Sequence, residues 1–88
     1  MSRISQPAFR KIAQQALNVL YDAFPVPQST RQVAEEMVRD NEFTLKVLQF
    51  LEQQKLAVRV DQGKMGLLEK TVRWKIAPSA KSRMDAVV

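Results

Sequence analysis

The feature that most constrains the fold is a change in hydrophobic period at Lys55. Before this residue, apolar side chains recur at three- and four-residue steps, as on the buried face of a helix. From Leu56 onward they recur at every second residue, as on one face of a strand. A chain of 88 residues with 45% apolar residues can form one compact core. The sequence therefore predicts a single small α+β domain, mainly α, that ends in a two-stranded β-hairpin.

Two amphipathic helices are predicted in the first half of the chain. The first covers about Pro7–Phe24 and ends there because the prolines at 25 and 27 cannot continue a helix. The second begins after Ser29, which is followed three residues later by Gln32 in the pattern of a capping box, and it ends near residue 38 or 39. Each helix contributes one apolar stripe to the core.

A third helix is predicted over Asn41–Gln54, with Asp40 or Asn41 as its N-cap. The turn before it contains no glycine, so residues 38–41 must make it, and we expect Asp or Asn to take the left-handed conformation there. One arc of this helix is apolar and the opposite arc is polar. The core-facing arc comprises Phe43, Thr44, Val47, Leu48 and Leu51, and the outward arc comprises Glu42, Lys46, Gln49 and Gln53, flanked by Leu45.

Two strands with one apolar and one basic face are predicted after the third helix. Both glycines of the chain fall in Asp61–Gly66, which predicts a turn between the strands, and Pro78 ends the second strand. The predicted apolar face comprises Leu56, Val58, Val60, Val72, Trp74 and Ile76, and the predicted basic face comprises Arg59, Arg73 and Lys75, with Lys64 at the tip and Lys70 beside it.

Positive charge is concentrated in the second half of the chain. Residues 1–44 carry five Lys and Arg against five Asp and Glu, whereas residues 45–88 carry nine against four, which accounts for the net charge of +5. Such clustering is typical of nucleic-acid binding, and it also suits a solvated face that keeps a protein soluble. Charge alone leaves both interpretations open.

The inventory of side chains argues against catalysis. The chain contains no cysteine and no histidine, which excludes thiol nucleophiles, disulfides, imidazole bases and ordinary zinc sites. Glu35 and Glu36 are adjacent on a predicted helix and point in different directions, while Asp40 and Glu42 suit cap and surface positions. No glycine-rich phosphate loop is present. We therefore expect a protein that is not an enzyme and needs no metal or cofactor.

The order of three helices and a hairpin resembles the winged-helix family over about residues 7–77. Ser29–Met37 looks like the second helix of that family. Phe43–Leu51, continuing through residues 52–60, is similar to its recognition helix running into the wing. Lys55 stands where many members have glycine. The resemblance implies a three-helix winged helix-turn-helix with a C-terminal hairpin as its wing.

The resemblance also implies which side chains meet DNA. The recognition helix would lie in the major groove, where Lys46 could donate to guanine and Gln49 could pair with adenine. The start of the second helix would meet phosphate, and the hairpin would follow the neighbouring backbone. The implied DNA-binding residues are Ser29, Thr30, Arg31, Asn41, Glu42, Leu45, Lys46, Gln49, Arg59, Lys64, Arg73 and Lys75.

These implications lead to the expectation of a small transcriptional regulator that binds double-stranded DNA, with helix 41–54 in the major groove and hairpin 56–76 as a basic wing. Val19 and Tyr21 lie off the apolar stripe of the first helix. A homodimer through residues 7–24 would place two recognition helices on half-sites about one helical turn apart.

A second interpretation stays open because Glu42 is an acid near the start of the proposed recognition helix. It would accept from a cytosine amino group in one docking register and repel phosphate in another. The alternative is a winged-helix protein–protein interaction module within a larger complex. Its apolar surface would comprise Leu45, Phe50, Met65, Leu67 and Leu68.

Domain organisation and location follow from the same patterns. We expect a winged-helix domain over residues 1–78 and a flexible C-terminal tail over residues 79–88, in which Lys81 and Arg83 add phosphate contacts. Apolar runs fall far short of the roughly 20 residues that span a bilayer, and the N-terminus lacks the apolar region of a signal peptide. The expectation is a cytoplasmic, nucleoid-associated protein, or a nuclear one if eukaryotic, with no membrane partner and no small-molecule ligand.

Overall fold

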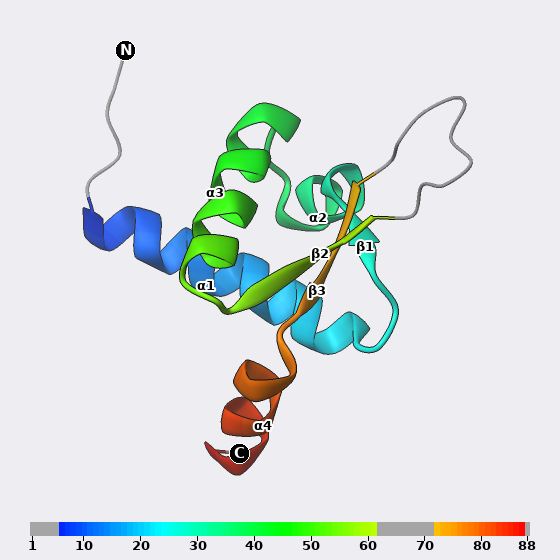
Figure 1. Ribbon diagram of the computed structural model, residues 1–88. Coiled ribbons are helices and arrows are strands. Elements are labelled where there is room, and N and C mark those ends of the chain that lie inside the picture. Colours follow the sequence, from blue (N-terminus) through cyan, green and yellow to red (C-terminus); the bar gives the residue numbers. More distant parts are fainter. Residues whose placement is uncertain (1–5, 62–71, 88) are drawn as a thin grey trace.

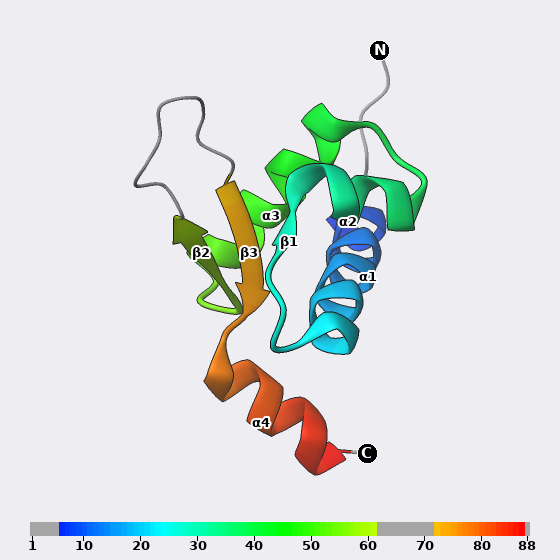
Figure 2. The ribbon, with the colours of Figure 1, turned by 90° about the vertical axis from the view of Figure 1, so that its right-hand side faces the viewer.

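The computed structural model describes residues 6–61 and 72–87, and within them it contains four helices and a three-stranded sheet (Figure 1). Three helices gather on one side of the sheet, and the fourth extends from the end of the last strand (Figures 1 and 2). In chain order the elements are α1 Gln6–Ala23, β1 Gln28–Ser29, α2 Thr30–Met37, α3 Asn41–Gln53, β2 Ala57–Asp61, β3 Val72–Ile76 and α4 Pro78–Val87.

The first three helices confirm the predicted segments to within about one residue at each end. The apolar stripe of α1 and the inner arc of α3 meet in the core, while α2 adds Val33 and Ala34. Trp74 from β3 lies fully buried among them. The buried residues of α1 are Ile12, Ala13, Ala16, Leu17 and Leu20, and those of α3 are Thr44, Val47, Leu48 and Leu51.

The capping box predicted for α2 is present. The Ser29 Oγ accepts from the Gln32 backbone N–H at 3.1 Å, and the Gln32 Oε1 accepts from the Ser29 N–H at 2.8 Å. Two orphan donors at the helix start are satisfied in this way.

The turn between α2 and α3 differs from the expectation, because Val38 and not Asp or Asn takes the left-handed conformation, with φ 57° and ψ 51°. The end of α2 determines this position: the N–H groups of Val38 and Arg39 donate back to Glu35 and Ala34 carbonyls at 3.3 and 3.0 Å. Asp40 is the N-cap of α3, as one of the two alternatives proposed, but its side chain makes no cap hydrogen bond.

The sheet has the strand order β1-β3-β2 with both pairings antiparallel, so a two-residue strand before α2 extends the predicted hairpin. Ala57 lies opposite Ile76 and Arg59 opposite Trp74. Residues directly opposite share a face, so Ala57 and Arg59 belong to the core side of the sheet.

The predicted faces of the first hairpin strand are therefore reversed. Val58 pairs with Lys75 and Val60 with Arg73 on the outer face, and Val58 is 37% exposed whereas Ala57 is 2% exposed. The antiparallel pairing with β3 sets this reversal, because it places Ala57 opposite the buried Ile76. In the second hairpin strand the prediction is correct, with Trp74 and Ile76 buried.

Residues 79–88, expected as a flexible tail, are helical through Val87. Pro78 both follows the strand and occupies the first position of α4, where its missing N–H is harmless. Ala80 is buried and Met84 packs against the core. α4 follows the predicted three helices and hairpin as an additional helix, and it depends on contacts with α1 that no local pattern reveals.

Candidate nucleic-acid interface

A shallow hollow of about 430 Å³ lies where the starts of α2 and α3 face the beginning of β3. Six of its seven lining residues are predicted DNA contacts, although they come from two segments separated by nine residues of chain. The fold thus brings the implied phosphate-binding and base-reading residues together. The lining residues are Ser29, Thr30, Arg31, Asn41, Glu42, Leu45 and Val72.

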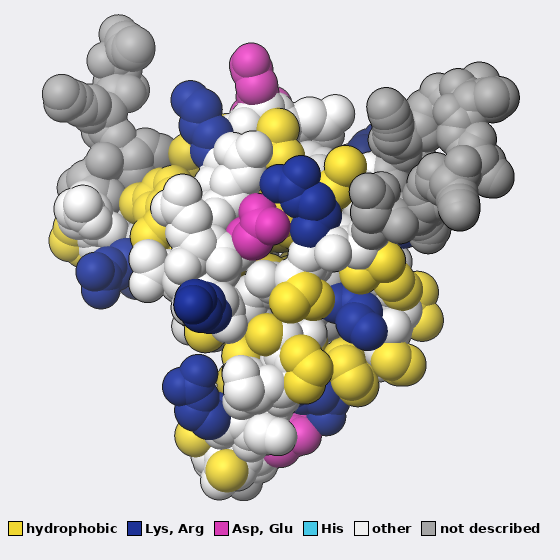
Figure 3. Space-filling view, in the orientation of Figure 1, with side chains coloured by type: hydrophobic (Ala, Val, Ile, Leu, Met, Phe, Trp, Pro, Cys, Tyr) yellow, Lys and Arg dark blue, Asp and Glu magenta, His cyan; other side chains and the backbone are white. Residues whose placement is uncertain are grey.

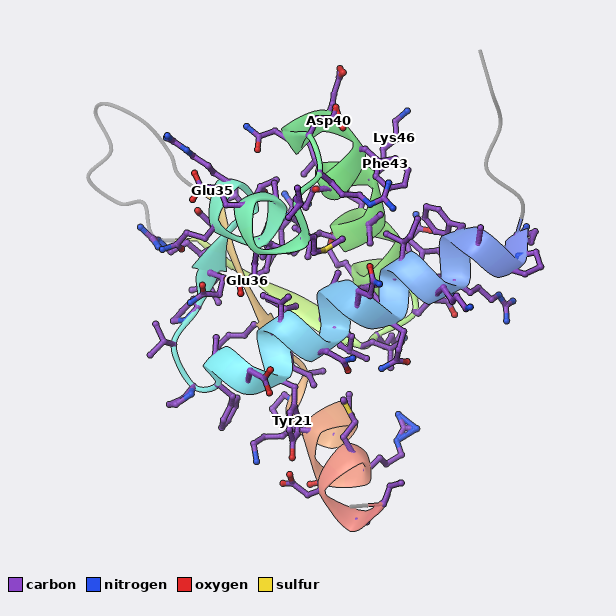
Figure 4. All side chains as sticks on the ribbon, turned by 180° about the vertical axis from the view of Figure 1, so that it is seen from behind. Tyr21, Glu35, Glu36, Asp40, Phe43 and Lys46 are labelled. Carbon is purple, nitrogen blue, oxygen red and sulfur yellow. The ribbon has the colours of Figure 1, made fainter. Side chains whose placement is uncertain are left out.

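The outward face of α3 continues from this hollow. Glu42, Lys46 and Gln49 are exposed, and Leu45 is 36% exposed. Figure 4 shows the Lys46 side chain projecting away from the body of the molecule. This face offers amide, ammonium and carboxylate groups without a dense cationic patch, in keeping with the spaced Lys and Arg side chains in Figure 3.

The start of α2 supplies one cation and two hydroxyl groups to the hollow. Arg31 pairs with Glu35 at 3.5 Å, but both side chains are well exposed, so this ion pair is weak and leaves Arg31 able to meet a phosphate. The Thr30 Oγ1 accepts from the indole Nε1 of Trp74 at 3.0 Å. The positive end of the α2 dipole favours an anion at the same place.

The predicted basic face of the hairpin is divided between the two sides of the sheet. Arg73 and Lys75 share the outer face. Arg59 instead lies on the core side, where its guanidinium pairs with Glu52 at 3.2 Å and stacks over the Trp74 ring at 5.1 Å from the centroid. Arg59 is therefore removed from the predicted basic row because the strand register points it at the indole. Lys64 and Lys70, with Met65, Leu67 and Leu68, lie outside the described residues.

Sequence reasoning missed two groups of contacts. The first is the Trp74–Thr30 hydrogen bond. A buried indole usually needs a hydrogen-bond acceptor, but the sequence does not indicate which residue provides it. The second joins α4 to α1: the Tyr21 hydroxyl donates to Asp85, and the Lys81 ammonium pairs with the same carboxylate at 2.7 Å. Only the i, i+4 spacing of Lys81 and Asp85 was visible in the sequence.

The charges of this second group perturb one another. The hydrogen bond to Asp85 raises the pKa of Tyr21, because the carboxylate favours the protonated phenol. The same carboxylate raises the pKa of Lys81. Hydrogen bonds from Lys81 and then from Tyr21 lower the pKa of Asp85.

An apolar hollow of about 450 Å³ lies between α1 and α4, with Leu17, Leu56 and Met84 in its lining and Arg83 beside them. No group of three or more His, Cys, Asp or Glu side chains suited to a metal occurs in residues 6–61 and 72–87. Over the same part of the chain, no helix combines the length and apolar character required to cross a membrane.

Comparison with known protein families and with curated proteins finds no match. Solved structures of similar fold include a possible transcriptional regulator from Methanosarcina mazei Go1, with TM-score 0.70 and 14% identity over 84% of this chain and 61% of that chain. A mutant of MepR from a multidrug-resistant S. aureus clinical isolate matches with TM-score 0.71 and 18% identity over 89% of this chain and 55% of that chain. Lactococcus lactis ZitR in complex with DNA matches with TM-score 0.59 and 17% identity over 83% and 49%.

This chain has the winged-helix fold, as its α+β architecture and these structural matches show. It covers 61% and 55% of the length of the first two of these proteins.

Proposed function

We propose that this protein binds double-stranded DNA as a small transcriptional regulator. The observation that carries the proposal is the hollow in which the start of α2 and the start of α3 together present six implied contact residues. One structural match is described as a possible transcriptional regulator and another was solved in complex with DNA, and both support the same function.

In this proposal α3 enters the major groove with Lys46 and Gln49 toward the base edges, and Ser29, Thr30 and Arg31 meet the phosphate backbone. The hairpin acts as the wing through Arg73 and Lys75, whereas Arg59 pairs with Glu52 and lies over the Trp74 ring. Lys46→Ala and Gln49→Ala should relax base preference, because each good bidentate contact contributes about 1–3 kcal/mol of discrimination.

The experiment that tests the proposal is binding of the purified chain to random-sequence duplex DNA at several salt concentrations. We expect affinity to fall steeply as the salt concentration rises, because lysine and arginine side chains that bind phosphate displace the counterions condensed on DNA. No measurable binding at low salt would overturn the proposal.

Charge reversal of the outer sheet face tests the wing. The double variant Arg73→Glu with Lys75→Glu should weaken binding to all sequences, and the slope of log affinity against log salt should become shallower by about 0.9 for each phosphate that the variant no longer neutralises. The matched control is Arg10→Glu with Lys11→Glu, which changes net charge equally on exposed positions of α1. Equal weakening in both variants would show a net-charge effect and contradict the assigned wing.

A second function, partner binding, is favoured by the apolar hollow between α1 and α4, which lies at the opposite end of the molecule from the start of α3 (Figures 1 and 2). Because Arg83 lines it, the occupant that fits is an amphipathic helix of another protein with acidic flanks. A synthetic Leu- and Glu-containing helical peptide should bind the unaltered chain and bind Arg83→Glu more weakly. Of the apolar surface that the sequence suggested for partners, Met65, Leu67 and Leu68 lie outside the described residues, and Phe50 packs within the chain, edge-on against Phe9 with ring centroids 5.1 Å apart.

A further inference from the structure

We propose that Trp74 is a positioning residue for phosphate binding: its indole N–H holds the oxygen of the Thr30 hydroxyl, so that the hydroxyl proton is directed to a DNA backbone phosphate. This inference rests on the proposed function and adds a residue that does not itself touch DNA.

The hydrogen-bonding capacity of a threonine hydroxyl carries the argument. Such a group has one proton to donate and two lone pairs that accept. The Thr30 Oγ1 already accepts from the Trp74 Nε1 at 3.0 Å. No group in residues 6–61 and 72–87 accepts the hydroxyl proton in return. Thr30 is half-buried and lines the hollow beside Ser29 and Arg31, so an anion in that hollow is a suitable acceptor.

The indole is itself held from several sides. Trp74 is fully buried, and β3 pairs with both neighbouring strands at this residue, opposite Gln28 and Arg59. The Arg59 guanidinium covers the ring at 5.1 Å from its centroid and is tied to Glu52 of α3. A donor fixed in this way leaves the threonine hydroxyl little rotational freedom, and a pre-oriented donor loses less entropy when a phosphate binds.

The alternative is that the bond only satisfies a buried indole, as many buried tryptophans require. The two roles differ in what they predict for DNA affinity. A purely structural bond would change stability and leave the affinity of the folded protein unaltered. A positioning bond would make the effects of Trp74 and Thr30 on affinity depend on each other.

The test is a double-mutant cycle in duplex DNA affinity, measured under conditions where every variant is folded. Thr30→Val removes the hydroxyl at nearly constant shape, and Trp74→Phe removes the indole N–H. We expect each to weaken binding by about tenfold, the effect of a hydrogen bond to a charged group. The salt slope should be unchanged, because neither variant removes a cation. The double variant should bind no more weakly than Thr30→Val alone.

Thr30→Ser is the matched control, since it keeps the hydroxyl and should keep affinity within about twofold. Trp74 is the only tryptophan of the chain, so its indole N–H gives a single side-chain NMR signal. If Trp74→Phe does not fold, this signal provides the test: it should shift when DNA binds to the unaltered chain, and it should not shift when DNA binds to Thr30→Val.

The outcomes separate the two proposals. If the unaltered chain does not bind DNA at low salt, the proposed function fails and this inference fails with it. If the unaltered chain binds, three results would overturn the inference alone. Thr30→Ser could bind as weakly as Thr30→Val, or the effects of Thr30→Val and Trp74→Phe on affinity could be independent. The third is an indole NMR signal that DNA shifts equally in the unaltered chain and in Thr30→Val.

Discussion

Among residues 6–61 and 72–87, Val38 and Lys55 adopt backbone conformations that glycine would adopt more easily. Val38, the C-cap of α2, has φ 57°, and Lys55, the second residue after the end of α3, has φ 63°. Lys55 stands where winged-helix proteins often have glycine, and its positive φ angle explains why glycine suits this position. A side chain with a Cβ atom is disfavoured in this region, and a β-branched one especially so.

Replacing Val38 with glycine should therefore stabilise the protein. The left-handed conformation costs a residue with a Cβ roughly 1–2 kcal/mol, and glycine's greater freedom in the unfolded chain offsets part of the gain, which leaves about 1 kcal/mol. The Val38 side chain is 88% exposed, so the substitution removes little packing. Urea unfolding measures the change in free energy of unfolding.

Val38→Ala is the control for this substitution. It removes the exposed branched side chain but keeps the Cβ atom. If alanine stabilises as much as glycine, the gain comes from removal of the side chain and the backbone explanation is wrong.

At the level of elements, α4 is attached through a small number of contacts. Ala80 and Met84 pack on the core, and Asp85 accepts from both Tyr21 and Lys81. The Lys81 ammonium also lies 5.0 Å from the centre of the Phe24 ring. Tyr21, labelled in Figure 4, lies beside α4, and its contact with Asp85 and that of Lys81 make the attachment dependent on pH.

The pH dependence has a definite sign at each end. Asp85 has a pKa below its usual 3.8, so its contribution is present above that value and is lost as the pH falls through the lowered pKa. Tyr21 has a pKa above its usual 10.0 and Lys81 above 10.5. Their contributions are complete below those values and are lost as the pH rises through the raised pKa values. The attachment of α4 should therefore be complete at neutral pH and loosen at both extremes.

Tyr21 is the only tyrosine, so ultraviolet titration of its phenol reports on this contact directly. We expect a midpoint above 10.0 in the unaltered chain and a clear fall toward 10.0 in Asp85→Asn. Asp22→Asn is the matched control, because Asp22 is the weakest of the groups that raise the pKa of Tyr21. A larger effect from Asp22→Asn would contradict the assigned hydrogen bond.

For the whole molecule, the proposed dimer through α1 is a separate question from the fold. Val19 and Tyr21, the residues suggested for a subunit contact, are partly buried against the core, and α4 engages Tyr21 within the same chain. An interface that uses Tyr21 would therefore also involve α4. It remains a proposal that two chains read a site together.

Selection of binding sites from a random DNA pool tests this proposal. If two chains bind together, the selected sequences should be inverted repeats whose half-sites lie about 10 base pairs apart, centre to centre. Sedimentation of the complex should give two chains per duplex. Single half-sites bound by one chain would contradict the dimer while leaving DNA binding intact.

The sequence by itself determined the first three helices of this protein. The three- and four-residue steps of apolar side chains in α1 and α3 specify which faces are buried, and Ser29 with Gln32 specifies where α2 begins. These signals are local, because a helix satisfies its backbone hydrogen bonds within one segment.

Only the tertiary structure decided the features that depend on neighbouring segments. In residues 56–60, apolar side chains occur on both alternating faces of the strand. The pairing with β3 therefore decides that Ala57 faces inward and Val58 outward. The same pairing placed Arg59 on Trp74, and only the approach of α2 to β3 gave the indole its partner in Thr30. A strand and a buried hydrogen-bond donor both find their partners in residues far away in the sequence. For that reason no local pattern could predict which face of β2 is buried or which residue accepts from the indole.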